Sequence, residues 1–208
     1  MTGKKVKSIE LVIATVLIIF LIIMFLVIPL SRARKCEKFA ICVSNLKQIG
    51  FIIHIYTQDY EGYLLPAYCQ SSDKYWFEIL DSYISKNISP KQKENLLVCP
   101  LDKNHIWRGT NYIYNGYYGF FLDSGYPKNL AYKPRKLSDF KHPEDTILLM
   151  DGKPDINPIF TYENYLSLID ERHKNICGGK FLLNVLYVDG RVKASNTSKF
   201  SFNQLCGY

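Results

Sequence analysis

The chain has 208 residues and a formal net charge of +7, from 26 Lys and Arg against 19 Asp and Glu. This length accommodates one membrane segment plus one compact domain of ordinary size. Residues 1–38 contain seven basic and two acidic side chains, a net charge of +5, so residues 39–208 carry only +2. The charge pattern therefore excludes the broad basic patch of a nucleic-acid-binding domain, and we expect no nucleic-acid partner.

Residues 8–30 predict a transmembrane helix. Within them the stretch LVIATVLIIFLIIMFLVIPL contains no charge, and twenty residues at about 1.5 Å each span roughly 30 Å, the hydrocarbon thickness of a bilayer. A cleaved signal peptide, the alternative, has an apolar region of only about 7–15 residues followed by small residues, whereas SRARK follows here. We expect an uncleaved anchor that contacts lipid through residues 8–30, after a basic leader-like segment at residues 1–7. Basic residues flank both ends, so the positive-inside rule does not predict its orientation.

Residues 31–58 predict an amphipathic continuation of the same helix. Apolar side chains recur there at spacings of three and four, and polar side chains such as Asn45 fill the other face. The apolar positions are Cys36, Phe39, Ala40, Val43, Leu46, Ile49, Ile53 and Tyr56. Pro29 lacks a backbone N–H and should kink the helix near the membrane edge. Gly62 and Pro66 mark the end of a single long helix.

Residues 59–208 predict a globular domain. WFEILDSYI (76–84) is typical of a short helix, and TILLMDG (146–152) is typical of a strand. NVLYV-DG-RVKAS (184–195) predicts a β-hairpin in which Asp-Gly forms a type I′ turn. The fold class that we expect is α+β: one long N-terminal helix packed on a small antiparallel sheet, with a loop-rich aromatic region.

Residues 59–145 are rich in tyrosine and irregular in pattern. Two interpretations are open for these aromatic rings: a core beneath long loops, or a platform that stacks sugars or bases. We favour the core.

The cysteines and histidines show no metal-ligand pattern. No C-x-x-C occurs and the four histidines lack zinc-like spacing, so we expect no structural metal and no cofactor. An even number of cysteines in an exported domain permits disulfides, and the first pairings to test are Cys69 with Cys99 and Cys177 with Cys206. The six cysteines are Cys36, Cys42, Cys69, Cys99, Cys177 and Cys206. Cys36 and Cys42 lie on different sides of one helix and cannot bond each other, and we expect Cys42 to be packed.

Two further groups of residues could carry chemistry. His173 and Asp189 invite an acid–base interpretation, but no nucleophile motif accompanies them and the turn already explains Asp189. We therefore expect no catalytic residue and a non-enzymatic protein. Asp151, Asp155, Asp170 and Asp189 could offer oxygen ligands to calcium, although their spacing does not match an EF-hand loop.

Several sequence blocks together resemble the type IV pilin-like pseudopilins. The first is a basic leader and an aliphatic helix that starts with Glu10, followed by SRARK and CVSNLKQIGFIIHIYTQDYEGYLLP. The later blocks LLVCPLD, NYIYNGYYG and RHKNICGGKFLLNVLYVDGRV are similar to the prepilin-type bacterial proteins whose C-terminal signature is His, nine residues and Asp-Gly. The blocks occur in the family's order and span most of the chain.

The resemblance implies a pilin-like fold and a structural role in a type II secretion or type IV pilus-like assembly. It places the protein in the bacterial inner membrane with a single pass and the domain at 59–208 in the periplasm or outside the cell. The implied partners are other pilin-like subunits and secretion machinery. In such fibres the glutamate, here Glu10, pairs with the new N-terminal amine of a neighbouring subunit.

Two positions depart from the family pattern. Lys5 stands where the leader peptidase requires glycine, and Val6 stands at the first mature residue, which weakens the case for a prepilin peptidase as partner. Fifteen residues, not nine, separate His173 from Asp189 and Gly190, and the role of these signature residues stays open. The altered cleavage site favours the alternative of an envelope-anchored binding or display protein that uses the same fold without polymerising.

Overall fold

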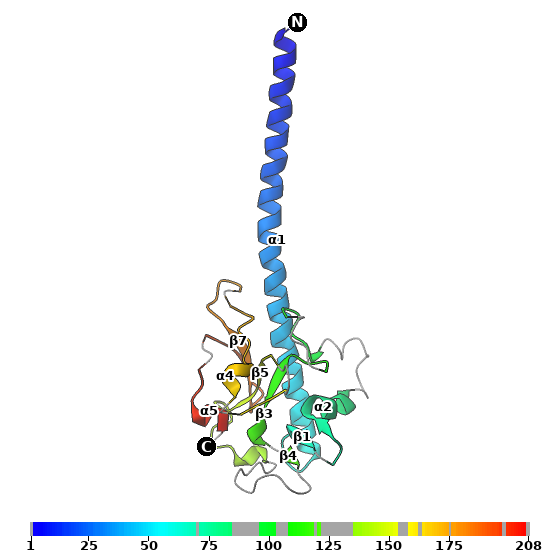
Figure 1. The fold of residues 1–208 in the computed structure, drawn as a ribbon, viewed down its shortest axis with the longest axis vertical. Coiled ribbons are helices and arrows are strands. Elements are labelled where there is room, and N and C mark those ends of the chain that lie inside the picture. Colours follow the sequence, from blue (N-terminus) through cyan, green and yellow to red (C-terminus); the bar gives the residue numbers. More distant parts are fainter. Residues whose placement is uncertain are drawn as a thin grey trace.

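The computed structural model consists of a long helix whose C-terminal end is embedded in a head of short helices and two sheets (Figure 1). The description covers residues 2–69, 71–84, 96–102, 108–118, 120–121, 135–153, 158–161, 164–174, 176–196 and 199–206. Within helix α1, side chains are described from residue 9 onward except at residues 26–29.

Helix α1 runs from Thr2 to Asp59, 58 residues, as one continuous element. At about 1.5 Å per residue it is roughly 87 Å long. The helical assignment continues through residue 29, and Figure 1 shows α1 as a rod with no sharp bend along its length, so the kink expected at Pro29 is not seen. The prediction of a single helix shared by both halves is confirmed, and the missing N–H of Pro29 does not divide it.

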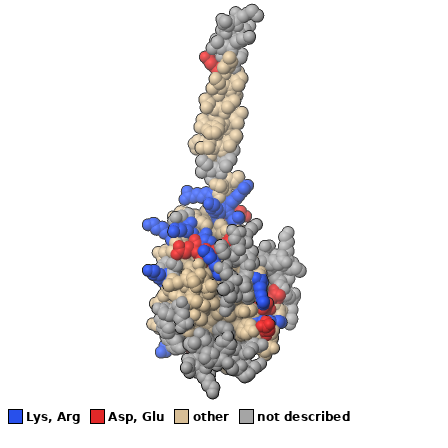
Figure 2. Space-filling model, viewed as in Figure 1, with Lys and Arg blue, Asp and Glu red and all other residues tan. Residues whose placement is uncertain are grey.

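The N-terminal part of α1 projects away from the head and touches nothing else in the described chain (Figure 2). From Ile9 to Phe25 every large apolar side chain is exposed, from 45% at Met24 to 80% at Phe25. This is the one helix among the described residues that is long and apolar enough to cross a membrane. Lys and Arg side chains gather where α1 meets the head (Figure 2), and Arg32 and Arg34 follow directly on the apolar run.

The C-terminal part of α1 packs against the head along one face. Leu46, Ile49 and Ile53 have no exposed surface, as their spacing predicted. The predicted boundary of this face is wrong at two positions: Ala40 is exposed, and Asn45, expected on the polar face, is buried. Asn45 tolerates burial because its side-chain N–H donates to the Val98 carbonyl, at 3.2 Å.

The head is built on a five-stranded sheet in the order β6-β3-β5-β7-β8. Neighbouring strands are antiparallel except for the β3–β6 pair, which is parallel. The strands are β3 (Tyr112–Asn115), β5 (Ile147–Asp151), β6 (Ile159–Phe160), β7 (Leu183–Tyr187) and β8 (Val192–Ser195). The predicted strands near residues 147 and 184–195 are confirmed, and the parallel edge strand β6 is an addition to the expected antiparallel sheet.

Shorter elements complete the head. A small sheet of order β2-β1-β4 has one antiparallel pair, β1–β2, and one parallel pair, β1–β4. Its strands are β1 (Tyr68–Cys69), β2 (Lys74–Tyr75) and β4 (Phe120–Phe121); the helices are α2 (Trp76–Ile84), α4 (Tyr165–Leu168) and α5 (Phe202–Cys206), with 3₁₀ turns at Gly116–Tyr118 and Leu137–Asp139. The predicted helix at 76–84 is α2, and the fold class is α+β.

Both faces of the large sheet are covered. One face packs against α1 and α2, and the other packs against α4, α5 and neighbouring loops. Trp76, Tyr112 and Tyr114 are completely buried, and the Trp76 and Tyr114 rings stack with centroids 5.5 Å apart. These aromatic side chains form a core, as predicted, and not an exposed stacking platform.

The β7–β8 hairpin turns differently from the expected type I′ geometry. Only Gly190 has a positive φ, of 86°, whereas Asp189 does not. The Gly190 N–H donates to the Tyr187 carbonyl, at 3.0 Å, which is the pattern of a type I turn followed by a left-handed glycine. The Asp189 side chain accepts the Arg191 N–H at 2.9 Å, so Asp189 closes the turn through its carboxylate.

Candidate functional site

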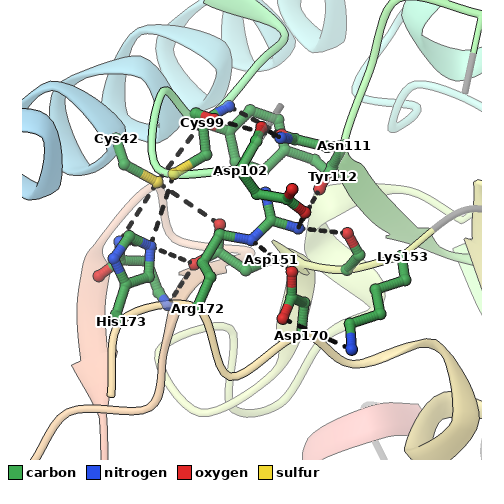
Figure 3. A network of polar contacts seen from close by, with 12 residues as sticks. Cys42, Cys99, Asp102, Asn111, Tyr112, Asp151, Lys153, Asp170, Arg172 and His173 are labelled. Atoms are coloured by element: carbon green, nitrogen blue, oxygen red, sulfur yellow. Dashed lines mark hydrogen bonds and ion pairs between the residues drawn. The ribbon is translucent and has the colours of Figure 1, made fainter. Parts of the chain in front are cut away.

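Four metal-ligand-type side chains converge in the head beneath α1. Cys42, Cys99, Asp151 and His173 each offer one ligand atom, and these atoms all lie within 4.8 Å of one another (Figure 3). All four residues are completely buried. We call this set the Cys–His–Asp cluster.

Asp151 and His173 form the charged centre of the cluster. The His173 Nε2 lies 2.9 Å from the Asp151 Oδ2. Burial alone would lower the pKa of His173, but the Asp151 carboxylate outweighs that effect and raises the pKa to about 9. Burial would raise the pKa of Asp151, yet the charges of His173 and Arg172 hold it below its usual range.

The thiols of Cys42 and Cys99 complete the cluster. The Cys99 Sγ is 3.7 Å from the His173 Nε2, and the Cys42 Sγ donates to the Asp151 Oδ1 at 3.5 Å. The neighbouring side chains of Cys42 and His173 lower the pKa of Cys99 to about 6, although burial acts in the opposite direction. Burial raises the pKa of Cys42. Cys99 is therefore the thiol poised to carry negative charge.

Four separate segments supply the cluster. Cys42 comes from α1 and Asp151 is the last residue of β5. Cys99 is held by Asn111, which accepts the Cys99 N–H at 2.7 Å and donates back to its carbonyl at 3.2 Å. His173 sits in the turn before β7, where its N–H donates to the Leu182 carbonyl at 3.0 Å. Tertiary structure alone brings these residues together.

Polar neighbours orient the cluster. Asn184 lies on β7, and its backbone N–H donates to the Asp151 Oδ2 at 2.7 Å. The Asn184 Nδ2 lies 3.3 Å from the Cys42 Sγ. The Tyr112 hydroxyl lies 3.5 Å from the same sulfur. The carboxylate of Asp151 and the thiol of Cys42 are thus fixed from β7 and β3.

A buried arginine lies beside the cluster. The Arg172 side chain is 3% exposed, and its Nε is 3.0 Å from the Asp170 Oδ2 while its Nη2 is 3.7 Å from the Asp102 Oδ2. Nη2 also donates to the carbonyls of Asn111, at 3.2 Å, and Gly152. Arg172 therefore fixes the loop that carries His173 to the ends of β3 and β5 (Figure 3).

The arrangement does not fit nucleophilic catalysis. In a thiol–imidazole–carboxylate triad the carboxylate binds one ring nitrogen and the thiol binds the other. Here the Asp151 carboxylate and the Cys99 thiol both face Nε2 of His173. None of the three side chains reaches solvent, so a substrate has no access to the sulfur.

The disulfide in the described chain joins Cys36 of α1 to Cys177 of the loop before β7. The expected pairing of Cys177 with Cys206 is therefore wrong, and Cys69 and Cys99 are free thiols and not partners. The bond closes a sequence separation of 141 residues, with the two Cα atoms 5.3 Å apart. It attaches α1 covalently to the head six residues before Cys42.

The predicted signature residues are not brought together. His173 pairs with Asp151 in the core. Asp189 lies in the exposed β7–β8 turn, where its Oδ2 is 3.9 Å from the Arg191 Nε. Of the acidic residues considered for calcium, Asp151 and Asp170 engage His173 and Arg172, and Asp155 lies outside the described residues. No shared calcium site forms among the described members of that set.

The predicted assembly residues lie on the projecting part of α1. Glu10 is exposed at the start of the bare apolar surface. Lys5 and Val6 belong to α1, but their side chains lie outside the described part of the chain.

Sequence reasoning missed the partners of His173. Along the chain, 57 positions separate Cys42 from Cys99, 52 separate Cys99 from Asp151, and 22 separate Asp151 from His173. Metal-ligand motifs are recognised by short spacing, and no such signal exists here.

No protein-family model, curated protein or solved structure matches the chain.

Proposed function

We propose that the protein is a membrane-anchored, pilin-like structural subunit that assembles through its long helix. The N-terminal half of α1 anchors it in the bacterial inner membrane as a single pass, and the head lies in the periplasm or outside the cell. The work of such a subunit is assembly with other pilin-like subunits and with secretion machinery, and it requires no covalent chemistry.

The observation that carries the proposal is the division of one helix between two environments. Residues 11–25 are exposed and, except for Thr15, apolar, whereas Leu46, Ile49 and Ile53 of the same helix are buried in the head. Exposing so much apolar surface to water is unfavourable, by about 25 cal/mol per Å². A bilayer removes that cost for a segment about 30 Å long, and the basic residues at its ends suit anionic head groups.

A second apolar strip continues along α1 beside the head. Ile41, Phe51 and Ile55 are 41%, 67% and 37% exposed. On a helix of 3.6 residues per turn they share one side, roughly opposite the buried face. The groove between this strip and α2 is lined by side chains that include Ile52 and Tyr83. We assign it to α1 of a second copy, because the strip prolongs the surface that the anchor already presents to parallel helices.

The sequence resemblance to pseudopilins supports the same assignment. A carboxylate such as Glu10 is costly at membrane depth unless it is partnered, and in a fibre the partner is the N-terminal amine of the neighbouring chain. In a chain that keeps its leader, Glu10 remains among the lipid head groups near the basic residues that precede it.

A second function deserves a test because of Lys5. A lysine at the position of the cleavage glycine favours an uncleaved, non-polymerising envelope protein that displays its head for binding. N-terminal sequencing of the native protein separates the two functions. A chain that begins at Val6 supports assembly, and one that begins at Met1 or Thr2 supports static display.

Photo-crosslinking in intact cells tests assembly directly. A photoreactive amino acid at Phe51 should give covalent dimers and a ladder of higher species in the carbonate-resistant membrane fraction. The matched control is the same amino acid at Leu166, a 60% exposed apolar position on α4, which should remain monomeric. Monomer at both positions, or recovery of the protein in the cytosol, would contradict the proposal.

A further inference from the structure

The Cys–His–Asp cluster has the composition of a zinc site. Zn²⁺ in structural sites takes four ligands drawn from thiolate, imidazole and carboxylate, in tetrahedral geometry. Two sulfur ligands favour zinc or another soft transition metal over calcium or magnesium, which prefer oxygen. Here the set is two sulfurs, one nitrogen and one oxygen, all buried.

Two of the distances between the ligand atoms are close to those of a tetrahedral centre, and all of these atoms lie within 4.8 Å of one another. Metal–ligand bonds of about 2.0–2.3 Å place neighbouring ligand atoms roughly 3.3–3.8 Å apart. The Cys99 Sγ–His173 Nε2 and Cys42 Sγ–Asp151 Oδ1 distances are 3.7 and 3.5 Å. The His173 Nε2 lies 2.9 Å from the other carboxylate oxygen, Asp151 Oδ2, and 3.0 Å from the Asn184 Nδ2, and both contacts must widen to admit the ion.

The surroundings support two of the four ligands, whereas the Nδ1 of His173 has no hydrogen-bond partner among the described residues. Ligands are normally held by outer hydrogen bonds, and Asn184 supplies two, to Asp151 and toward Cys42. Two thiolates, one carboxylate and a neutral imidazole around Zn²⁺ leave a charge of −1. The guanidinium of Arg172, which also pairs with Asp170 and Asp102, interacts electrostatically with Asp151 and Cys99 and so lowers the cost of that charge inside the core.

We propose that Cys42, Cys99, Asp151 and His173 bind one Zn²⁺ ion that cross-links α1 to the head. Ligation through Nε2 of His173 leaves the imidazole proton on Nδ1. The ion joins α1, the segment before β3, the end of β5 and the turn before β7. On α1 it lies six residues, about 9 Å, from the Cys36 disulfide, so two adjacent cross-links fix the helix where it enters the head. This inference does not depend on membrane assembly.

Metal analysis of the full-length protein in detergent tests the proposal. The protein is purified through a tag without histidine, and bound zinc is counted by mass spectrometry. The expected result is one zinc per chain. Replacement by Co²⁺ should give visible ligand-field bands of a tetrahedral ion together with a near-ultraviolet thiolate charge-transfer band.

Matched cysteine variants locate the ion. Cys99→Ser should weaken Co²⁺ binding at least tenfold and reduce the thiolate charge-transfer band, because one sulfur remains. Cys69→Ser removes a free thiol outside the cluster and should leave both unchanged. Added Zn²⁺ should raise the melting temperature of the metal-stripped wild type and of Cys69→Ser, but not that of Cys99→Ser. Because each variant is compared with and without Zn²⁺, a lower starting stability of Cys99→Ser does not obscure the result.

Three results would overturn the zinc assignment. They are sub-stoichiometric zinc that is equal in wild type and Cys99→Ser, a Co²⁺ spectrum without thiolate charge transfer, and a Cys42–Cys99 disulfide found by peptide mapping of the unreduced native protein. The last would assign the two thiols to a second covalent cross-link at the same position.

Discussion

The two halves of helix α1 share one backbone geometry but differ in what surrounds them. Apolar side chains from Ile9 to Phe25 cover the entire circumference and are all exposed, whereas between Cys42 and Tyr56 they are buried along one face. The first pattern needs an apolar solvent on every side, and the second needs a partner on one side. The contrast teaches that one helix can have two surroundings: its first half is compatible with a membrane anchor, and its second half is part of the head. Each prediction alters one of these two halves.

The largest expected effect is loss of membrane insertion when charge is placed in the bare half. Each arginine at the centre of a transmembrane helix costs about 2.5–3.5 kcal/mol on insertion, so Ile18→Arg combined with Leu21→Arg should move the protein out of the carbonate-resistant membrane fraction. Immunoblots of fractionated cells measure this.

The control is Leu166→Arg, on the exposed surface of α4, which should fractionate as wild type does. Membrane retention of the double variant would mean that the bare half does not lie in lipid.

In the embedded half, removal of buried volume should destabilise the head. Leu46 has no exposed surface, and Leu46→Ala should lower the free energy of unfolding by about 2–5 kcal/mol through lost burial and a cavity. Urea unfolding in detergent, followed by tryptophan fluorescence, reports on this core, which contains Trp76.

Phe51→Ala truncates a larger side chain that is 67% exposed on the same helix and should change the free energy by no more than about 0.5 kcal/mol. Equal losses in the two variants would show that the buried face has been wrongly placed.

The covalent link between helix and head should contribute next. Cys36→Ser opens a bond that spans 141 positions and should lower the free energy of unfolding by about 2–5 kcal/mol, mainly because the unfolded chain gains freedom. Urea unfolding under non-reducing conditions measures the change, with Cys69→Ser as the thiol control. A Cys177–Cys206 bond in peptide maps of the native protein would contradict the pairing.

The smallest effect should come from the close approach of α1 to β7. A Cβ placed on Gly50 would lie 2.8 Å from Cδ1 of Leu186. Gly50→Val should therefore cost about 1–3 kcal/mol by overpacking, less the gain from replacing glycine in a helix. Urea unfolding in detergent measures this change. Ala40→Val, on the exposed side of α1, is the matched control and should change the urea midpoint by less than half as much.

Much of the fold follows from sequence periodicity. The continuous apolar run and the three-and-four spacing after residue 31 predict α1 correctly, and short strands with turn residues locate β5, β7 and β8. Asn45 was misplaced because its burial depends on a carbonyl, that of Val98, supplied by a distant loop. The short parallel strand β6 has only two residues, too few for a periodic pattern.

The candidate site was largely invisible in the sequence. His173 was singled out, but the aspartate that it contacts is Asp151 and not Asp189. Cys42 follows from helix periodicity as a packed residue, and nothing local distinguishes it as a ligand. Only the packing of α1 against β7 and β8 places the sulfur of Cys42 beside Asp151. Contacts of this kind join distant parts of the chain, and rules based on sequence spacing do not contain them.

The central claim, that a single rod joins lipid to head, is tested most directly by one distance in liposomes. Nitroxide amino acids introduced at Phe20 and Ala40, with all native cysteines retained, lie on either side of Pro29. An unbroken helix predicts a narrow distribution centred at about 30 Å between the two backbone positions, from 20 residues at 1.5 Å each. A broad distribution, or one centred well below that value, would show that the rod breaks at the membrane edge and would contradict the account.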